Sequence, residues 1–159
     1  MTGLDLRALI QRVSSASVRV DEKTVGEIET GLLLFVGFAR EDNKNQVDAT
    51  LDKVLGSRIF PDTGADGKVR MSNSLSDIGG GLLIVPQFTL VADTAKGLRP
   101  GFSTAASPAD AISLYEYFVQ EARARHTRVE TGLFGADMQV ALVNDGPVTF
   151  LLEYPAASR

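Results

Sequence analysis

The chain has 159 residues, of which 44% are hydrophobic and 23% are charged, and its net charge at pH 7 is −4. These values are typical of a globular protein, and we expect residues 1–159 to form a single domain. The acidic balance argues against a protein that grips nucleic acid along its whole length. A few Arg and Lys residues could still contact one end of a tRNA.

The missing residue types exclude several kinds of chemistry. The chain has no cysteine and a single histidine, His126. A thiolate nucleophile, a disulfide framework and a multi-histidine metal site are therefore excluded within one chain. A Ser-His-Asp triad would need His126, but its charged surroundings favour a solvent-exposed residue at a helix end. We predict no metal site and no cofactor.

The sequence also carries no membrane or export signal that we can identify. No segment approaches the roughly 20 apolar residues of a membrane helix. The first twelve residues lack the apolar core and cleavage site of a signal peptide. We therefore expect a cytoplasmic protein without a membrane partner.

The first third of the chain has the pattern of strands. Alternating apolar residues predict one long or bent strand at 6–20, and a turn at Lys23-Thr24 leads into a short strand at 25–28. The segment 31–39 is apolar on both faces, which is typical of a buried central strand.

A helix is expected at 43–60, because Val47, Leu51, Val54 and Leu55 form one apolar stripe. Arg58 near its end would complement the negative C-terminus of the helix. Pro61 then ends the helix, and 62–68 is expected to be a loop.

The second half predicts a strand, a loop, a helix and two strands. The strand at 79–92 contains Pro86, which donates no ladder hydrogen bond, so Gln87 and Phe88 are candidates for unpaired backbone N–H groups. A loop at 93–107 precedes a helix that Ser107 caps, with Pro108 in its first turn and a further capping signal at Asp110.

The last two strands are expected at 138–143 and 148–154, on either side of a turn at 144–147. Few helices among many strands favour an α+β fold. We expect a barrel-like antiparallel or mixed sheet with two main helices.

Two segments are candidates for a binding site. Pro86 to Leu90 places an amide and a hydroxyl side chain in an otherwise apolar strand, although a strand that crosses from core to surface would look the same. The second is 144–149, where Gly146-Pro147 could be a simple turn or a cis bond; such bonds make up about 5–6% of X–Pro bonds in folded proteins.

The order of several short motifs resembles the D-aminoacyl-tRNA deacylase family over residues 6–154. The motifs are Ala8-Leu9-Ile10-Gln11-Arg12-Val13, Gln87-Phe88-Thr89-Leu90, Ala92-Asp93-Thr94, Gly97, Arg99-Pro100, Phe102-Ser103 and Asn144-Asp145-Gly146-Pro147-Val148-Thr149. Each motif is weak alone, and the ordered set is highly specific. The family usually has Ser where this chain has Pro86. The proline lacks the hydroxyl and the backbone N–H that a serine would place beside the site.

The resemblance implies a homodimeric, barrel-like hydrolase that cuts the ester between a D-amino acid and the terminal adenosine of tRNA. It also implies removal of glycine mischarged onto tRNA. Gln87 and Thr89 would be the catalytic residues, and Phe88 and Pro86 would bind the aminoacyl-adenosine end. Gly146 and Pro147 match a Gly-cisPro motif that reaches into the partner's site and rejects L-amino acids, and Arg12 matches an arginine that braces it.

The resemblance further implies that the 2′-hydroxyl of the tRNA assists catalysis. Thr89 has no apparent base beside it in the sequence, so we expect it to bind and orient the substrate rather than to be acylated. Two alternatives stay open: a hydrolase with Thr89 as the nucleophile, and a dimeric module that binds its ligand without catalysis.

Overall fold

The computed structural model describes residues 5–155. The elements, in chain order, are β1 (Asp5–Val20), β2 (Lys23–Ile28), β3 (Gly31–Gly37), α1 (Lys44–Gly56), β4 (Phe60–Thr63), β5 (Val69–Asn73), α2 (Leu75–Ile78), β6 (Gly81–Pro86), the 3₁₀ helix η1 (Phe88–Val91), α3 (Pro108–Arg125), β7 (Val129–Thr131) and β8 (Gln139–Pro155).

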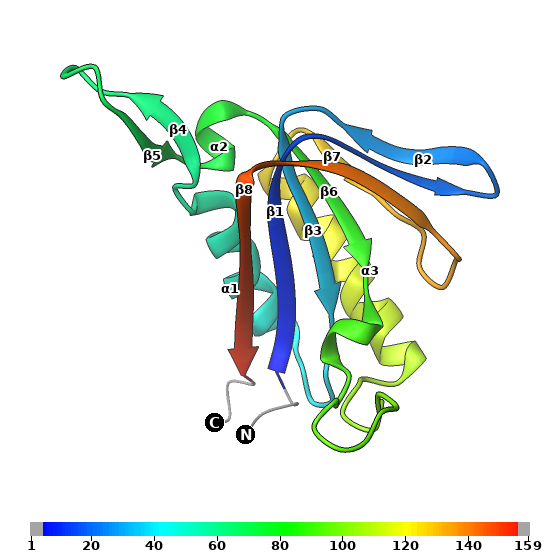
Figure 1. Ribbon diagram of the computed structural model, residues 1–159. Helices are drawn as coiled ribbons and strands as arrows, with labels where there is room; N and C mark the ends of the chain where they lie inside the picture. Colours follow the sequence, from blue (N-terminus) through cyan, green and yellow to red (C-terminus); the bar gives the residue numbers. More distant parts are fainter. Residues whose placement is uncertain (1–4, 156–159) are drawn as a thin grey trace.

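A six-stranded mixed sheet forms the body of the protein (Figure 1). Its order is β2-β1-β3-β6-β7, and β8 pairs with β1. β1 pairs with three strands. β8 pairs along nearly all of β1, β3 pairs with its first half and β2 pairs with its second half. Sixteen residues of strand would extend about 53 Å, and β1 bends where its register with β8 shifts around Val13.

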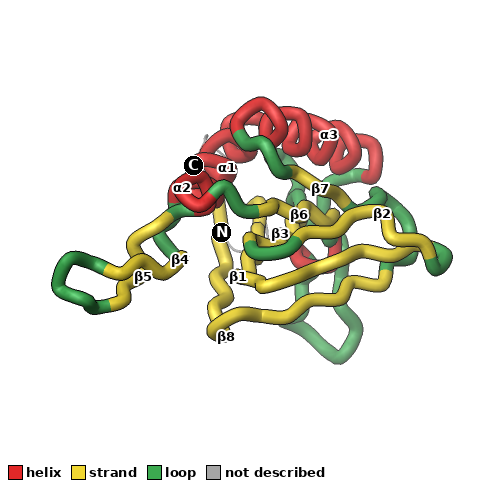
Figure 2. The backbone as a smooth tube through the Cα atoms, turned by 90° about the horizontal axis from the view of Figure 1, so that it is seen from above, coloured by secondary structure: helices red, strands yellow, loops and turns green. Residues whose placement is uncertain are grey.

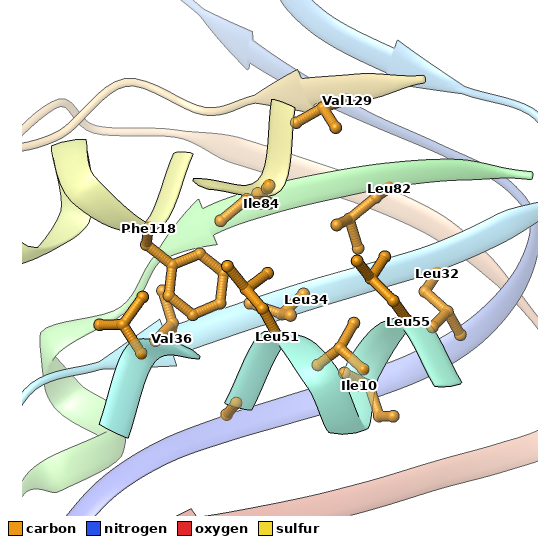
Figure 3. Close-up of a cluster of buried hydrophobic side chains, with 14 of the residues drawn as sticks. Ile10, Leu32, Leu34, Val36, Leu51, Leu55, Leu82, Ile84, Phe118 and Val129 are labelled. Atoms are coloured by element: carbon orange, nitrogen blue, oxygen red, sulfur yellow. The ribbon is translucent and has the colours of Figure 1, made fainter. Parts of the chain in front are cut away.

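Both long helices cover the same face of the sheet (Figure 2). β3, β6 and β7 are parallel neighbours, and the chain crosses from one to the next in the same direction. Parallel crossovers are right-handed, so α1 and α3 lie on one side. Figure 3 shows the resulting core, in which Leu51 and Leu55 of α1 and Phe118 of α3 meet side chains of the sheet.

A second apolar cluster lies on the other face, where the strands curl over. Its buried members are Val13, Ala16, Val18, Ile28, Leu33, Leu83 and Val85. β2 and β7 approach without pairing: a Cβ atom on Gly26 would lie 2.5 Å from the carbonyl oxygen of Thr131. The sheet is therefore nearly closed, which confirms the barrel-like mixed sheet.

The predictions for the first half of the chain are confirmed in outline and wrong at several boundaries. The single long strand β1 and the buried strand β3 are present. Lys23 and Thr24 begin β2, and the turn lies one pair earlier, at Asp21 and Glu22, which both have positive φ. α1 ends at Gly56, so Arg58 lies beyond it.

Three segments differ in kind from the prediction. The expected loop at 62–68 is the tip of a β4–β5 hairpin. The strand expected at 79–92 ends at Pro86 and continues as η1, because proline stops the ladder. The expected strands at 138–143 and 148–154 belong to one strand, β8, and both parts pair with β1 rather than with each other.

α3 begins as predicted, with the Ser107 hydroxyl accepting a hydrogen bond from the N–H of Asp110. α2 and β7 were not predicted; each is only three or four residues long. His126 lies at a helix end as expected, since it is the C-cap of α3. Its expected solvent exposure was wrong: it is buried, and its Nε2 lies 2.6 Å from the Gly80 carbonyl oxygen. Among residues 5–155, no helix has the length and apolar character to cross a lipid bilayer.

Candidate functional site

The segment after β6 forms a small polar surface with free backbone donors. The Gln87 N–H donates to the Val36 carbonyl oxygen at 2.8 Å, so the expectation that it is unpaired was wrong. η1 starts at the next residue, and the first N–H groups of a helix have no partner within it. We find no acceptor for the N–H groups of Phe88 and Thr89 among residues 5–155. These two donors can face a ligand.

The polar side chains of this segment interact with each other at the surface. The Gln87 amide donates to the Thr89 hydroxyl oxygen, and Thr89 is exposed. The Thr89 hydroxyl oxygen accepts this hydrogen bond, which orients the hydroxyl group. Its own proton remains available for donation to another acceptor. No histidine, lysine or carboxylate contacts this hydroxyl among the described residues, so no general base is positioned on it.

Two exposed aromatic rings stand beside these groups. Phe88 is 59% exposed and Phe102 is 42% exposed, and their ring centroids are 5.1 Å apart. Two adjacent exposed rings form a candidate ligand surface, since nucleobases stack well on aromatic rings. Phe102 belongs to one of the motifs that carry the family resemblance, but no role was predicted for it from the sequence.

The loop at 93–107 is held against the end of β3 by backbone hydrogen bonds. Asp93 and Gly101 exchange two bonds of 2.8 Å, and the Arg40 N–H donates to the Thr104 carbonyl oxygen at 2.9 Å. The Thr104 hydroxyl donates to the Val91 carbonyl oxygen at 2.9 Å. These bonds hold the loop that carries Phe102 against η1, so the Phe88–Phe102 pair is fixed by backbone contacts.

The second candidate segment is a bulge in β8. Val13 pairs with Asn144 and Gln11 pairs with Thr149, so residues 145–148 lie opposite Arg12 alone. The Gly146–Pro147 bond is cis. The Asn144 side chain accepts from the Val148 N–H at 2.8 Å and donates to the Thr149 hydroxyl at 2.9 Å, which closes the bulge.

Arg12 joins this bulge to the root of the β4–β5 hairpin. Its Nε donates to the Asp145 carbonyl oxygen at 3.0 Å, and its Nη1 donates to the Ile59 carbonyl oxygen at 2.7 Å. The Asp145 carboxylate lies 3.5 Å from Nε. The Arg12 side chain is only 12% exposed, so this fork is largely shielded from water and holds both segments in place.

The predicted site residues fall into two separate groups in one chain. Arg7 donates to the Leu90 carbonyl oxygen at 3.1 Å, so the first residues of β1 lie beside η1. Arg12, five residues further along the same strand, marks the bulge. Five strand residues span about 17 Å. The structure therefore brings Pro86, Gln87, Phe88 and Thr89 together, brings Arg12, Gly146 and Pro147 together, and keeps the two groups apart.

An uncovered apolar row lies between the two groups on the face away from the helices. Leu9 pairs with Phe35 on one side and with Leu151 on the other, and Leu151 is 50% exposed. Arg7 and Glu153 form an ion pair next to this row. No cluster of three or more metal-ligating side chains occurs among residues 5–155.

Fold and site together define a barrel-like α+β protein whose candidate site offers backbone N–H groups, an amide, a hydroxyl and aromatic rings. The sequence profile of the D-Tyr-tRNA(Tyr) deacylase family matches residues 9–153. The chain is 56% identical to the D-aminoacyl-tRNA deacylase of Cellvibrio japonicus over 145 residues, which cover 91% of this chain and 97% of that protein. It is also 56% identical to the enzyme of that name from Haemophilus ducreyi, with the same coverage.

Solved structures agree with this match. The c-Myc DNA Unwinding Element Binding Protein superimposes with a TM-score of 0.87 at 36% identity, over 94% of this chain and 99% of that one. A probable eukaryotic D-amino acid tRNA deacylase superimposes with a TM-score of 0.81 at 18% identity, over the same shares, and shows the common fold. The chain belongs to the D-Tyr-tRNA(Tyr) deacylase family.

Proposed function

We propose that this protein is a D-aminoacyl-tRNA deacylase that acts in the cytoplasm, with residues 1–159 as one deacylase domain. It hydrolyses the ester that joins a D-amino acid to the terminal adenosine of tRNA, and it releases D-amino acid and free tRNA. It acts likewise on mischarged glycyl-tRNA, because glycine has no side chain to reject. The names of the relatives support the activity, and the free N–H groups of Phe88 and Thr89 are the observation that carries the chemistry.

A homodimer completes the site. In one chain, the group around Thr89 lies beside Arg7 and the group around Gly146 lies beside Arg12, and these two positions on β1 are about 17 Å apart. In an isologous dimer, each surface contacts its equivalent in reciprocal fashion, so the bulge of one protomer can reach η1 of the other. The apolar row that contains Leu9 and Leu151 supports this arrangement, because it lies between the two groups and is partly uncovered.

The bulge of the partner rejects the L-amino acid. The substrates of either hand carry the same groups, so the site must place an obstacle where only the L side chain would go. The fork of Arg12 and the Asn144 side chain hold the bulge in one shape, which supports its use as a fixed wall. An obstacle of about 4 kcal/mol is enough for a thousandfold preference. A D side chain points away from this wall, and many D side chains are therefore accepted.

Water attacks the ester carbonyl with help from the substrate itself. The 2′-hydroxyl of the terminal ribose positions or activates the water, and the N–H groups of Phe88 and Thr89 stabilise the oxyanion that develops. The carbonyl carbon gains the water oxygen, the ester bond to the ribose 3′-oxygen breaks, and that oxygen leaves with a proton. Thr89 and Gln87 orient the aminoacyl group. Among residues 5–155 no base lies beside the Thr89 hydroxyl, which supports this role over that of a nucleophile.

The tRNA end is recognised with few charges. Phe88 and Phe102 provide a stacking surface for the terminal adenine. Lys96 and Arg99 are exposed on the same loop as Phe102 and can contact backbone phosphates. The overall charge of −4 limits this grip to the end of the tRNA.

The direct test compares matched substrates. D-tyrosyl-tRNA and L-tyrosyl-tRNA are incubated with the protein, and the released tyrosine is measured. We expect the D substrate to be cut at least a thousandfold faster than the L substrate. If D-tyrosine stays on the tRNA under conditions in which the protein binds it, the protein is a binding module and the proposal is wrong.

A second substrate separates the two catalytic mechanisms. A D-tyrosyl-tRNA with a 2′-deoxy terminal adenosine keeps the ester and lacks the assisting hydroxyl. We expect its hydrolysis to fall by several orders of magnitude. Hydrolysis at an undiminished rate would instead favour Thr89 as the nucleophile.

A further inference from the structure

The β4–β5 hairpin is an arm that projects from the body next to the bend of β8 (Figures 1 and 2). It forms a two-stranded sheet of its own. Ile59 and Phe60 at its root are buried, whereas its strands are exposed. An isolated two-stranded hairpin is marginally stable in water. A segment of this kind that is anchored at the root and uncovered along its length is suited to packing against something else.

The arm has one apolar face and one charged face. Pro61 pairs with Met71 and Thr63 pairs with Val69, so these four side chains share a face. Val69 is 67% exposed and Met71 is 52% exposed. The opposite face carries Asp62, which pairs with Arg70. The arm bears as many acidic as basic side chains from Phe60 to Asn73, which does not favour a polyanion as its partner.

Arg12 connects this arm to the bulge of β8. One guanidinium donates to the Ile59 carbonyl oxygen at the root of the arm and to the Asp145 carbonyl oxygen of the bulge. The arm and the bulge therefore keep a fixed mutual placement. If the bulge enters the site of a second protomer, the arm must lie beside that same site.

The surface beside that site is apolar as well. Leu98 is completely exposed in the loop at 93–107, and Phe102 of the same loop is 42% exposed. In one protomer, the root of the arm lies beside Arg12, whereas the loop follows η1, which lies beside Arg7, so about 17 Å of β1 separates the two. A reciprocal dimer turns one protomer end for end against the other, so the arm of each meets the loop of the other.

We propose that the apolar face formed by Pro61, Val69 and Met71 packs against the loop at 93–107 of a second copy of this chain, over Leu98 and beside Phe102. This contact closes one side of the aminoacyl-adenosine site. The proposal rests on the dimer of the proposed function and extends it, because it assigns a partner to two surfaces that one protomer leaves uncovered.

A charge placed on the apolar face tests the contact. In Val69→Lys/Met71→Lys, two lysines enter the proposed interface, and we expect the dimer dissociation constant from sedimentation equilibrium to rise at least about tenfold. The matched control, Asp62→Lys, changes the net charge by the same +2 on the opposite face of the arm and should stay within about twofold of wild type. An equal effect of both variants, or none of either, would overturn the proposal.

A cross-link tests the partner surface. The chain has no cysteine, so Met71→Cys/Leu98→Cys introduces one defined pair. We expect mild oxidation to give a covalent dimer in high yield, and the control Met71→Cys/Ile112→Cys to give little. If the wild-type protein is a dimer that cuts D-tyrosyl-tRNA but the Met71→Cys/Leu98→Cys variant gives no covalent dimer, the arm contact is wrong and the proposed function stands. If the wild-type protein is a monomer and still cuts the same substrate, both the shared site and the arm contact are wrong.

Discussion

Arg7 and Arg12 lie five residues apart on the same strand, and each holds one half of the candidate site. Arg7 donates to the Leu90 carbonyl oxygen at the end of η1, and Arg12 donates to the Asp145 carbonyl oxygen of the bulge in β8. Because their strand is stiff and extended, the separation of the two halves is a property of the backbone and not of side-chain rotamers. This separation is the structural reason for our proposal that two protomers share the site.

Replacement of Arg12 by lysine should disturb the bulge without removing the charge. A lysine ammonium cannot reproduce the planar fork that reaches both carbonyl oxygens. We expect the preference for D- over L-tyrosyl-tRNA to fall about tenfold or more, and the free energy of unfolding to fall by about 1–3 kcal/mol. Hydrolysis assays with both substrates and urea denaturation check this. An unchanged preference would show that the fork does not shape the wall.

Gly146→Ala should damage the wall directly. Gly146 has φ of 145°, and an added Cβ would lie 2.6 Å from Val148 Cγ2 and 2.8 Å from its backbone nitrogen. The bulge must then change shape, so hydrolysis of L-tyrosyl-tRNA should become measurable. The control is Gly135→Ala, which also has positive φ but open space around the added atom. If both variants select the D substrate as wild type does, the bulge is not the wall.

Thr89→Ala should retain part of the activity. If Thr89 orients the substrate, its loss should lower kcat about 10- to 100-fold, whereas loss of a nucleophile should abolish turnover. Thr89→Ser keeps the hydroxyl and should be close to wild type in either case. Mass spectrometry during turnover supplies the decisive reading, since a trapped acyl group on Thr89 would contradict the assignment.

Phe102→Ala should weaken substrate binding more than it slows the reaction. Stacking of a base on an aromatic ring contributes about 1–3 kcal/mol, so KM should rise about tenfold while kcat changes little. Phe102→Tyr keeps the ring and serves as the control. A drop in kcat without a change in KM would place Phe102 in the reaction rather than in binding.

Tyr115 provides a test of the core between α3 and the sheet. Its hydroxyl donates to the Ile84 carbonyl oxygen at 2.9 Å, and that oxygen also accepts the Gly132 N–H. Tyr115→Phe should therefore cost only about 0.5–1.5 kcal/mol of the free energy of unfolding.

The same side chain links stability to alkaline pH. Burial raises the pKa of Tyr115 above its ordinary value of 10.0, so the folded protein favours the neutral phenol. The unfolded chain ionises first as the pH rises above 10, and the native state loses stability there. Urea denaturation between pH 8 and about 11 should show this loss in wild type and a smaller loss in the Phe variant. An identical slope in both would contradict it.

The local pattern of residues was enough for the elements whose character depends on their own sequence. The alternation in β1, the continuous apolar run of β3 and the capping residues Ser107 and Pro108 of α3 each predict the observed element. Their physical cause is local, since each depends on the burial of a periodic face or on hydrogen bonds within a few residues. The motifs around Gln87 and Gly146 were likewise visible as a set.

Tertiary structure decided everything that depends on residues far apart in the chain. Residues 144–147 look like a hairpin turn, but β1 is long enough to pair with both flanking segments, so they form a bulge instead. His126 looks like an exposed helix end, but the carbonyl group of Gly80 approaches its ring. The sequence alone therefore predicted most residues of the candidate site, and the structure added Phe102 beside Phe88. Only the pairing of distant strands decided that one chain holds those residues in two places, because strand register is set by partners that no local pattern specifies.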